Sequence, residues 1–172
     1  MDIYGNRSRV HRQSFLSAEG TIAEIESFGR SADGCRILIK LENQDGNVTE
    51  FVISADTYVA DFTTLTEGME VQFYYRTDVP VPLIYPPRYP AAVVVPKRSD
   101  GLFVTVGYFN GALINEEQTL QVNLDSNVEM ITPNNQKYLG SPAHHSLVVF
   151  YRNSTRSIPA QTTPEKIVVL CR

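Results

Sequence analysis

Several features that assign proteins to a class are scarce or missing in this chain of 172 residues. Tryptophan is absent, and the two cysteines, Cys35 and Cys171, are too few for a small scaffold built on disulfides. No apolar run approaches the ~20 residues of a membrane span. The first residues, MDIYGNRSRVHRQSFL, lack the apolar core of a secretory leader. We therefore expect no membrane span, and synthesis in the cytoplasm without a signal peptide.

Sequence motifs of catalysis are missing as well. The chain has no glycine-rich phosphate loop, no nucleophile elbow and no HExxH zinc motif. The pair His144-His145 has no further ligand types clustered beside it, and the pair Glu116-Glu117 lies in a polar stretch typical of a solvated loop. The sequence predicts a protein that is not an enzyme, with no catalytic residue, no cofactor and no metal.

Charge is distributed unevenly along the chain. The formal net charge is −4, from 15 Lys and Arg against 19 Asp and Glu. Residues 1–18 hold Arg7, Arg9 and Arg12 against Asp2, about +2, which leaves about −6 for the remainder. An acidic body disfavours nucleic acid, which is bound mainly through Lys and Arg, so no nucleic-acid partner is expected. Residues 1–18 are either an unstructured arm or an arm that docks on an acidic neighbour.

Alternating apolar residues and turn signals predict short strands through the rest of the chain. The first half contains strands at residues 21–28, 36–41, 49–53, 69–75 and 92–95. Asp45-Gly46 marks a hairpin turn, and the proline-rich stretch from Pro80 to Pro90 cannot be a central strand. The second half repeats the order, with strands at residues 103–109, 119–124, 127–131, 147–151 and 167–170.

The repeat divides the chain into a basic arm (1–18), a first module (19–96), a linker (97–102) and a second module (103–172). It pairs Phe73-Tyr74 with Phe150-Tyr151, and Val93-Val94-Val95 with Ile167-Val168-Val169. Five short strands with an irregular insert between the third and fourth is the order of an OB-type barrel. We predict an all-β fold of two tandem OB-like Greek-key β-barrel modules that share an interface, because each half alone would bury only a thin core.

A family resemblance rests on two stretches of sequence. SIPAQ at residues 157–161, followed by KIVV at 166–169, resembles small uncharacterised OB-like domains of spore-forming bacteria. The doubled arrangement, with PVPLIYPPRYPA in the first half, is similar to an uncharacterised two-module family of the same group, over residues 20–171. The first module departs from this pattern, since LIYPP at 83–87 stands where SIPAQ stands in the second. The resemblance implies an OB-like fold and a place on the spore or cell surface after lysis, and it assigns no site residues.

Two groups of residues are candidates for contacts. Tyr74, Tyr75, Tyr85 and Tyr89 cluster around the proline-rich stretch, where they either cap the core or form a rigid amphipathic surface for a protein or a small ligand. Cys35 and Cys171 are either small buried or semi-buried thiols or, in an oxidising compartment, crosslinking residues within the chain or between copies.

These features predict a non-enzymatic structural protein whose partners are copies of itself. Its concrete form would be the subunit of a spore-surface layer or filament, with the arm that carries Arg7, Arg9 and Arg12 docked on a neighbouring subunit. The alternative is a monomeric ligand- or peptide-binding module that uses the Pro/Tyr surface at residues 80–90.

Overall fold

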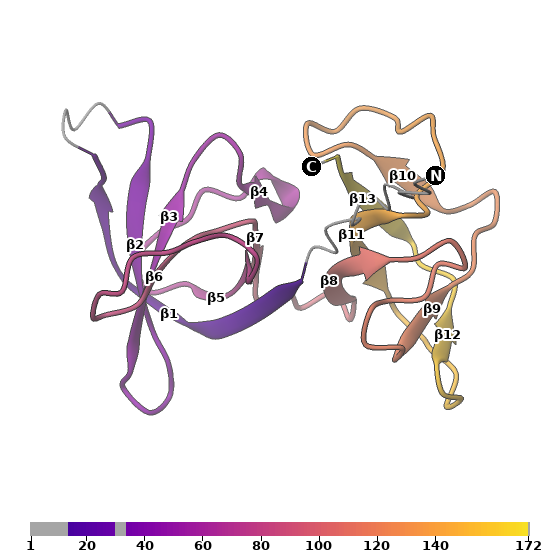
Figure 1. Cartoon of the computed structure of the whole chain (residues 1–172), viewed down its shortest axis with the longest axis horizontal. Coiled ribbons are helices and arrows are strands. Elements are labelled where there is room, and N and C mark those ends of the chain that lie inside the picture. Colours follow the sequence, from indigo (N-terminus) through magenta and orange to yellow (C-terminus); the bar gives the residue numbers. More distant parts are fainter. Residues whose placement is uncertain (1–13, 30–33, 172) are drawn as a thin grey trace, which may run out of the picture.

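The computed structural model describes residues 14–29 and 34–171, and these residues form an all-β structure, which confirms the predicted fold class (Figure 1). The described residues contain no α-helix, and a short 3-10 turn, η1 (Ala60–Phe62), follows the two-residue strand β4 (Tyr58–Val59). The longer strands follow stretches of alternating or of continuous apolar residues, as strands buried on one face or on both faces require. The other strands of the first half are β1 (Phe15–Ser27), β2 (Ile37–Glu42), β3 (Val48–Ile53), β5 (Glu70–Arg76), β6 (Arg88–Pro90) and β7 (Val93–Pro96). Those of the second half are β8 (Phe103–Phe109), β9 (Leu120–Val122), β10 (Glu129–Ile131), β11 (His145–Tyr151), β12 (Ala160–Thr162) and β13 (Lys166–Leu170).

The first half is a seven-stranded sheet with the order β4-β7-β5-β1-β2-β3-β6. Its long strand β1 pairs with β5 from Phe15 to Thr21 and with β2 from Thr21 to Ser27. Gly20 lies at this change of partner, where a Cβ atom would be 2.3 Å from the carbonyl oxygen of Glu42. Only glycine lets β1 approach β2 so closely at the point where β1 changes its pairing partner from β5 to β2.

Strand β1 begins earlier than the sequence indicated. Phe15 pairs with Arg76, and the ladder continues to Ala18 opposite Phe73. The boundary predicted at residue 18 is therefore wrong by four residues, because residues 15–18 belong to the sheet. The rest of the predicted arm, with Arg7, Arg9 and Arg12, lies outside the described residues.

The proline-rich stretch ends in β6, a three-residue strand at one edge of the sheet that contains Pro90. β6 pairs in parallel with β3, and after only two residues the chain continues as β7, which pairs with β5. Ala91 and Ala92 complete the connection, with the amide of Ala91 donating to Val52 O and that of Ala92 to Tyr74 O. The run from 88 to 96 thus contributes strands near both ends of the seven-stranded sheet, β6 at one edge and β7 beside β4 at the other.

The second half repeats part of this arrangement. Its four-stranded sheet has the order β10-β13-β11-β8, which matches β4-β7-β5-β1 strand for strand. The parallel pair of β12 and β9 corresponds to that of β6 and β3. No second-half strand corresponds to β2, since between β8 and β9 the described chain makes only isolated bridges such as Phe109 with Asn115. The second half therefore repeats the pairing with one strand fewer.

The registers of the two sheets correct the predicted repeat by one residue. When the pair Tyr74–Val93 is matched to Phe150–Lys166, every pair of β1, β5, β7 and β4 except Phe15–Arg76 finds a counterpart in β8, β11, β13 and β10. Phe73-Tyr74 then corresponds to Val149-Phe150, and Val93-Val94-Val95 corresponds to Lys166-Ile167-Val168. The predicted pairing was wrong, because it placed a residue of the first core, Phe73, opposite one that faces the other sheet, Phe150.

Three groups of buried side chains form the core. One lies inside the first half around the stacked rings of Phe51 and Phe73, 4.4 Å apart, and another lies inside the second half around Phe109 and Leu147. The third, the inter-sheet cluster, contains residues of both halves: Tyr58, Ala60, Tyr74, Val93, Val95, Ile131, Val148, Phe150 and Val168. Figure 1 shows the two groups of strands side by side, with β1 reaching from the first towards β8. The two halves therefore share part of their core.

No helix in the described part of the chain is long and apolar enough to cross a membrane.

Candidate functional site

The four predicted tyrosines do not form one surface. Tyr75 stacks on Tyr89 with ring centres 4.1 Å apart, and both rings are half-buried against the first core. Tyr85 is 90% exposed and lies beside the fully exposed side chain of Leu83. The Pro/Tyr surface therefore consists of a packed base, Tyr75 and Tyr89, and a projecting tip, Leu83 and Tyr85.

Tyr74 faces the opposite side of the sheet and belongs to the inter-sheet cluster, with only 7% of its surface exposed. Its hydroxyl donates to the carbonyl oxygen of Val104, 3.3 Å away on β8. Burial raises the pKa of Tyr74 to about 12, and burial likewise raises the pKa of Tyr58 to about 12. Both tyrosines stabilise the contact between the halves and are not available to an external ligand.

The base of the Pro/Tyr surface is fixed by an ion pair. Arg88 on β6 donates to the Oε2 atom of Glu50, at 2.7 Å from Nη2 and 2.9 Å from Nε. The Glu50 residue is 5% exposed, so this pair is screened from water on one side. The Arg88 guanidinium also lies 5.1 Å from the ring centre of Phe28. Glu50 and Arg88 are 38 residues apart, and no local pattern in the sequence indicates that they meet.

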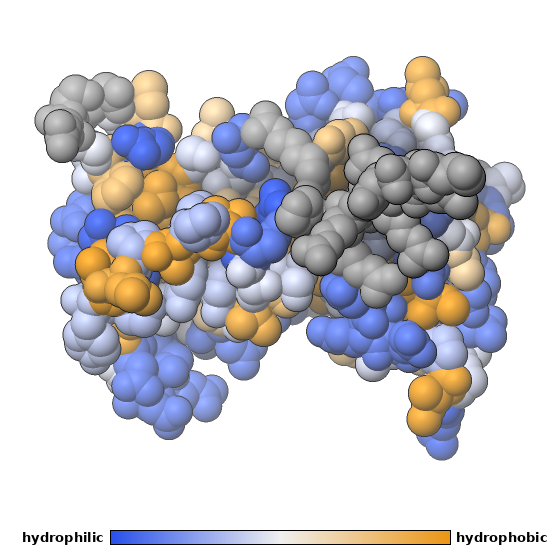
Figure 2. Space-filling model, viewed as in Figure 1, coloured by the Kyte–Doolittle hydropathy of each residue, from blue (hydrophilic) through white to orange (hydrophobic). Residues whose placement is uncertain are grey.

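Apolar side chains also project from the second half. Ile158, in the connection between β11 and β12, is 94% exposed, and this connection corresponds to the one that carries Leu83 and Tyr85. Figure 2 shows apolar atoms at the left end of the molecule, where the β5–β6 connection lies, and at its lower right tip, where the β11–β12 connection lies. The two halves therefore present apolar tips at equivalent positions.

A groove of about 980 Å³ runs along the first part of β1. Its walls are residues 17–21 of β1, the β2–β3 turn from Glu42 to Asn47, the start of β5, and the segment from Val95 to Val104 that connects the two halves. We call it the β1 groove. Because it lies where the halves meet, neither half forms it alone.

One wall of the β1 groove is an unpaired strand edge. The amide of Thr77 donates to Ser14 O, so the peptide groups of Ser14 face β5. Because successive residues of a strand direct their peptide groups to opposite sides, Leu16, Ala18 and Gly20 also direct theirs towards β5. Phe15, Ser17 and Glu19 direct theirs to the other side, and no strand of the described residues pairs with β1 there, since β2 begins its pairing at Thr21.

The charges around the β1 groove are mainly negative. Glu19, Glu42 and Asp45 are exposed and make no ion pair within the described part of the chain. The basic side chains of the wall are already paired: Lys97 lies 2.7 Å from Glu70, and Arg98 bonds to Asp61 and Asp100. The groove therefore presents three carboxylates without an opposing charge.

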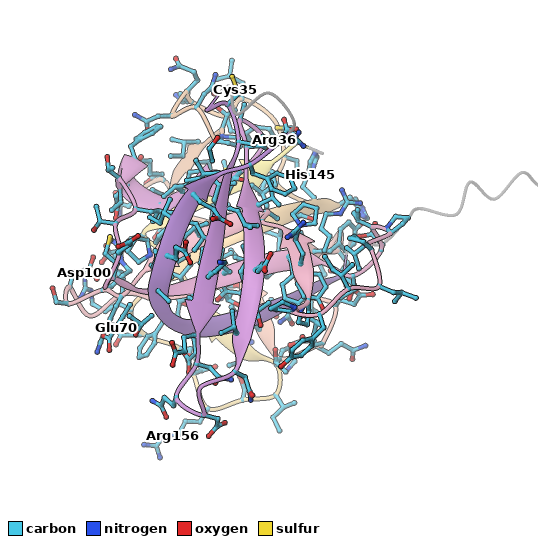
Figure 3. All side chains as sticks on the ribbon, turned by 90° about the vertical axis from the view of Figure 1, so that its left-hand side faces the viewer. Cys35, Arg36, Glu70, Asp100, His145 and Arg156 are labelled. Carbon is cyan, nitrogen blue, oxygen red and sulfur yellow. The ribbon has the colours of Figure 1, made fainter. Side chains whose placement is uncertain are left out.

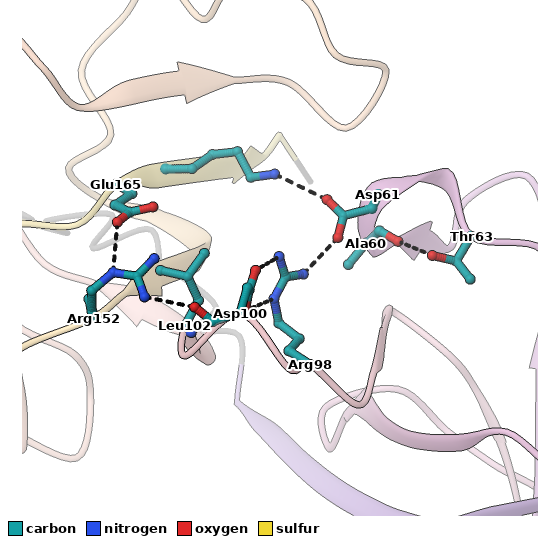
Figure 4. Close-up of polar contacts among 9 residues, drawn as sticks. Ala60, Asp61, Thr63, Arg98, Asp100, Leu102, Arg152 and Glu165 are labelled. Atoms are coloured by element: carbon teal, nitrogen blue, oxygen red, sulfur yellow. Dashed lines mark hydrogen bonds and ion pairs between the residues drawn. The ribbon is translucent and has the colours of Figure 1, made fainter.

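A polar network links the two halves beside the inter-sheet cluster (Figure 4). Asp61 accepts from Arg98 Nη1 at 2.7 Å and lies 3.6 Å from Lys166 Nζ on β13. Arg98 also binds Asp100, and Arg152 donates to the carbonyl oxygen of Asp100. Hydrogen bonds from Arg98, and then from the Leu102 amide, lower the pKa of Asp100 to about 2. No local sequence pattern indicates this network, because Asp61, Arg152 and Lys166 lie far along the chain from Arg98 and Asp100.

Both cysteines are exposed and neither forms a disulfide, so the interpretation as buried or semi-buried thiols is wrong. Figure 3 shows Cys35 at the upper edge of the molecule in that view, beside Arg36. No disulfide joins Cys35 to Cys171 within the chain. A crosslink between copies stays a prediction.

His144 and His145 have different surroundings. His145 Nδ1 lies 2.8 Å from the carbonyl oxygen of Ala143, and His144 Nδ1 lies 3.4 Å from the hydroxyl of Tyr108. The described residues contain no group of three or more His, Cys, Asp or Glu side chains that could hold a metal ion.

The fold and these surfaces define an all-β protein whose two related halves share a core and enclose an acidic groove. The sequence matches no protein-family model and no curated protein.

Proposed function

We propose that this protein is a non-enzymatic structural protein that associates with copies of itself, with the N-terminal arm of one subunit docked on the next. The observation that carries the proposal is the pair of outer strand edges. Within the described residues, β1 is unpaired on one side along Phe15, Ser17 and Glu19, and β8 is the last strand of its sheet. Such an edge offers peptide groups with which another chain can pair.

The proposed fold of each half is an OB-like barrel. The run from 88 to 96 supports it, because β6 bonds to β3 and β7 to β5, the opposite ends of the four-strand series β5-β1-β2-β3. The repeated strand order of the second half supports a duplication of the same module. Residues 97–102 would then be the linker between modules.

The proposed setting is a spore-surface layer or filament released when the producing cell lyses, and it rests on the family resemblance described above. Exposed Cys35 and Cys171 fit this setting, since thiols at the surface of a subunit can form disulfides between copies under oxidising conditions. Chains that pair through strand edges and then crosslink would give a layer that resists denaturants.

The test compares the full-length chain with a variant that lacks residues 1–13. This deletion spares Phe15, the first residue of β1, so it removes the arm and leaves the sheet. We expect the full-length protein to exceed its monomer mass of 19.3 kDa in size-exclusion chromatography with light scattering, and the deletion to reduce the mass towards that of the monomer. Electron micrographs of the full-length protein should show ordered assemblies. Monomers of both proteins at high concentration would rule the proposal out.

A monomeric binding module is the second candidate function, and the exposed tip at Leu83 and Tyr85 favours it. An anilinonaphthalene sulfonate dye, which binds exposed apolar surface, is a suitable probe. Tyr85→Ala should weaken dye binding and leave the melting temperature unchanged. Tyr89→Ala should lower the melting temperature instead, because its ring stacks on Tyr75. Equal dye binding by the wild type and Tyr85→Ala would remove the tip as a binding surface.

A further inference from the structure

We infer that the β1 groove binds residues 1–13 of a second copy of the chain, as an extended strand added along the outer edge of β1. This inference rests on the proposed self-association and names the surface that it uses. Three independent features carry it: the unpaired peptide groups of the edge, the charge of the groove, and the place where the arm leaves β1.

The edge supplies the backbone partners. Phe15, Ser17 and Glu19 direct their amide and carbonyl groups away from β5, towards the side of β1 on which β2 lies, and the end of β2 and the β2–β3 turn form a wall of the groove there. The corresponding edge of β8 is less suitable for an added strand. The carbonyl oxygen of Val104 already accepts from the Tyr74 hydroxyl, and that of Tyr108 accepts from the Glu116 amide. The edge of β1 is therefore the one that an incoming strand would extend.

The charges of the arm and of the groove are opposite in sign: Arg7, Arg9 and Arg12 against Asp2 give residues 1–13 a net charge of about +2. Residues 1–13 carry Arg7, Arg9 and Arg12, and the groove presents Glu19, Glu42 and Asp45 without opposing charges in the described residues. Arg7 and Arg9 are two residues apart, so in a strand their side chains lie on the same face. A carboxylate row that meets this face would orient the arm and increase the rate of association.

The arm of a second copy fits better than the chain's own arm. To pair with Phe15 and Ser17 in its own chain, the arm would have to reverse direction immediately before Phe15. The residues there, His11 to Ser14, include none of the Gly, Asn or Asp that tight hairpin turns require. An extended arm of 13 residues spans about 45 Å, enough to reach a neighbouring subunit.

Charge exchange in the full-length chain tests the pairing. The groove variant is Glu19→Arg with Glu42→Arg, and the arm variant is Arg7→Glu with Arg9→Glu and Arg12→Glu. A third protein combines all five changes. The matched control is Glu116→Arg with Glu117→Arg, which alters net charge equally at exposed positions outside the groove. Sedimentation velocity over a concentration series at low salt gives the association constant of each protein.

The groove variant and the arm variant should each associate at least about tenfold more weakly than the wild type, because attraction is replaced by repulsion at two or more contacts. The combined variant and an equimolar mixture of the two single variants should both recover association, and the control should match the wild type. Higher salt should weaken the wild type, since it screens exposed charges.

Other outcomes overturn the inference in distinguishable ways. If the wild type associates and the groove variant does so equally well, the arm docks elsewhere and the proposed self-association survives. If the combined variant recovers but the mixture does not, the arm binds within its own chain. A wild type that remains a monomer removes both the proposed function and this inference.

Discussion

At the scale of single residues, the side chain of Arg98 contacts both halves of the molecule and the segment that connects them. Its guanidinium bonds to Asp100 in the same connecting segment and to Asp61 in the 3-10 turn of the first half. It also lies 5.2 Å from the ring centre of Phe150 in the second half. Asp61 adopts a left-handed backbone conformation with φ of 57°, which aspartate tolerates better than most residues. One planar cation thus joins both halves to the segment between them.

The first prediction concerns the acid stability of this network. The pKa of Asp100 is lowered to about 2, so its carboxylate contributes stability above the value of about 4 that aspartate has in an unfolded chain. That contribution is lost as the pH falls from about 4 towards about 2. Urea unfolding at a series of pH values should show a decline of the free energy of unfolding in this window. Asp100→Asn should remove part of that decline, whereas Asp45→Asn, in the β2–β3 turn, should leave it unchanged. A decline of equal size in Asp100→Asn would contradict the prediction.

At the scale of elements, period-two alternation and short continuous apolar runs located the longer strands well. The prediction of residues 103–109 matches β8 without error, and those for β2, β3, β5, β7, β11 and β13 differ from the structure by at most two residues at either end. Strands β4, β6 and β12 have only two or three residues and were missed, since their partners define them rather than any local pattern. Short strands without alternation carry too little information to be found locally.

The sequence predicts the repeat, but the predicted pairing aligns the two halves one residue out of register. The run of valines in β7 explains this error. Val93 and Val95 face the inter-sheet cluster, whereas Val94 faces the first core, so both sides of β7 are apolar. A strand buried on both faces shows no alternation, and sequence comparison cannot then detect a slip of one residue.

The candidate site was only partly predictable. Tyr74 and Tyr75 are adjacent in a strand and must point to opposite faces, so alternation alone could have separated them. The acidic wall of the β1 groove combines Glu19 of β1, Glu42 at the end of β2 and Asp45 of the β2–β3 turn, and the proximity of β1 to the other two depends on strand pairing between distant parts of the chain. Local sequence patterns do not encode that proximity.

The second prediction compares two glycines at corresponding positions of β1 and β8. Gly20→Ala would place its Cβ 2.3 Å from the Glu42 carbonyl oxygen, a backbone atom that cannot move without disturbing β2. We expect a loss of about 3 kcal/mol of unfolding free energy, in line with overpacked sites. Gly107→Ala meets nothing within 4 Å, because the second half has no strand like β2, and it should be neutral or stabilise by up to ~1 kcal/mol. Chemical denaturation of both variants would check this, and equal effects would show that the close approach of β1 and β2 is absent.

At the scale of the whole molecule, the two sheets pack through corresponding faces. Tyr74 corresponds to Phe150, Val95 to Val168 and Ala60 to Ile131, and all six belong to the inter-sheet cluster. This is the arrangement of an isologous dimer interface, in which the same patch of each partner meets its counterpart. Here both partners are in one chain, so the contact forms at any protein concentration, and the outer strand edges remain for contacts between chains.

The third prediction follows from this shared core. Phe150 is fully buried in the inter-sheet cluster, with Lys166 Nζ 4.4 Å from its ring centre, so Phe150→Ala should cost about 3–5 kcal/mol. If the halves depend on each other, they unfold in one transition, and hydrogen exchange should accelerate in β2 and β3 as well as in β11 and β13. Phe51→Ala, a truncation inside the first core, should in turn accelerate exchange in the second half. Two separate unfolding transitions, or exchange that changes only in the mutated half, would show that each half is stable without the other.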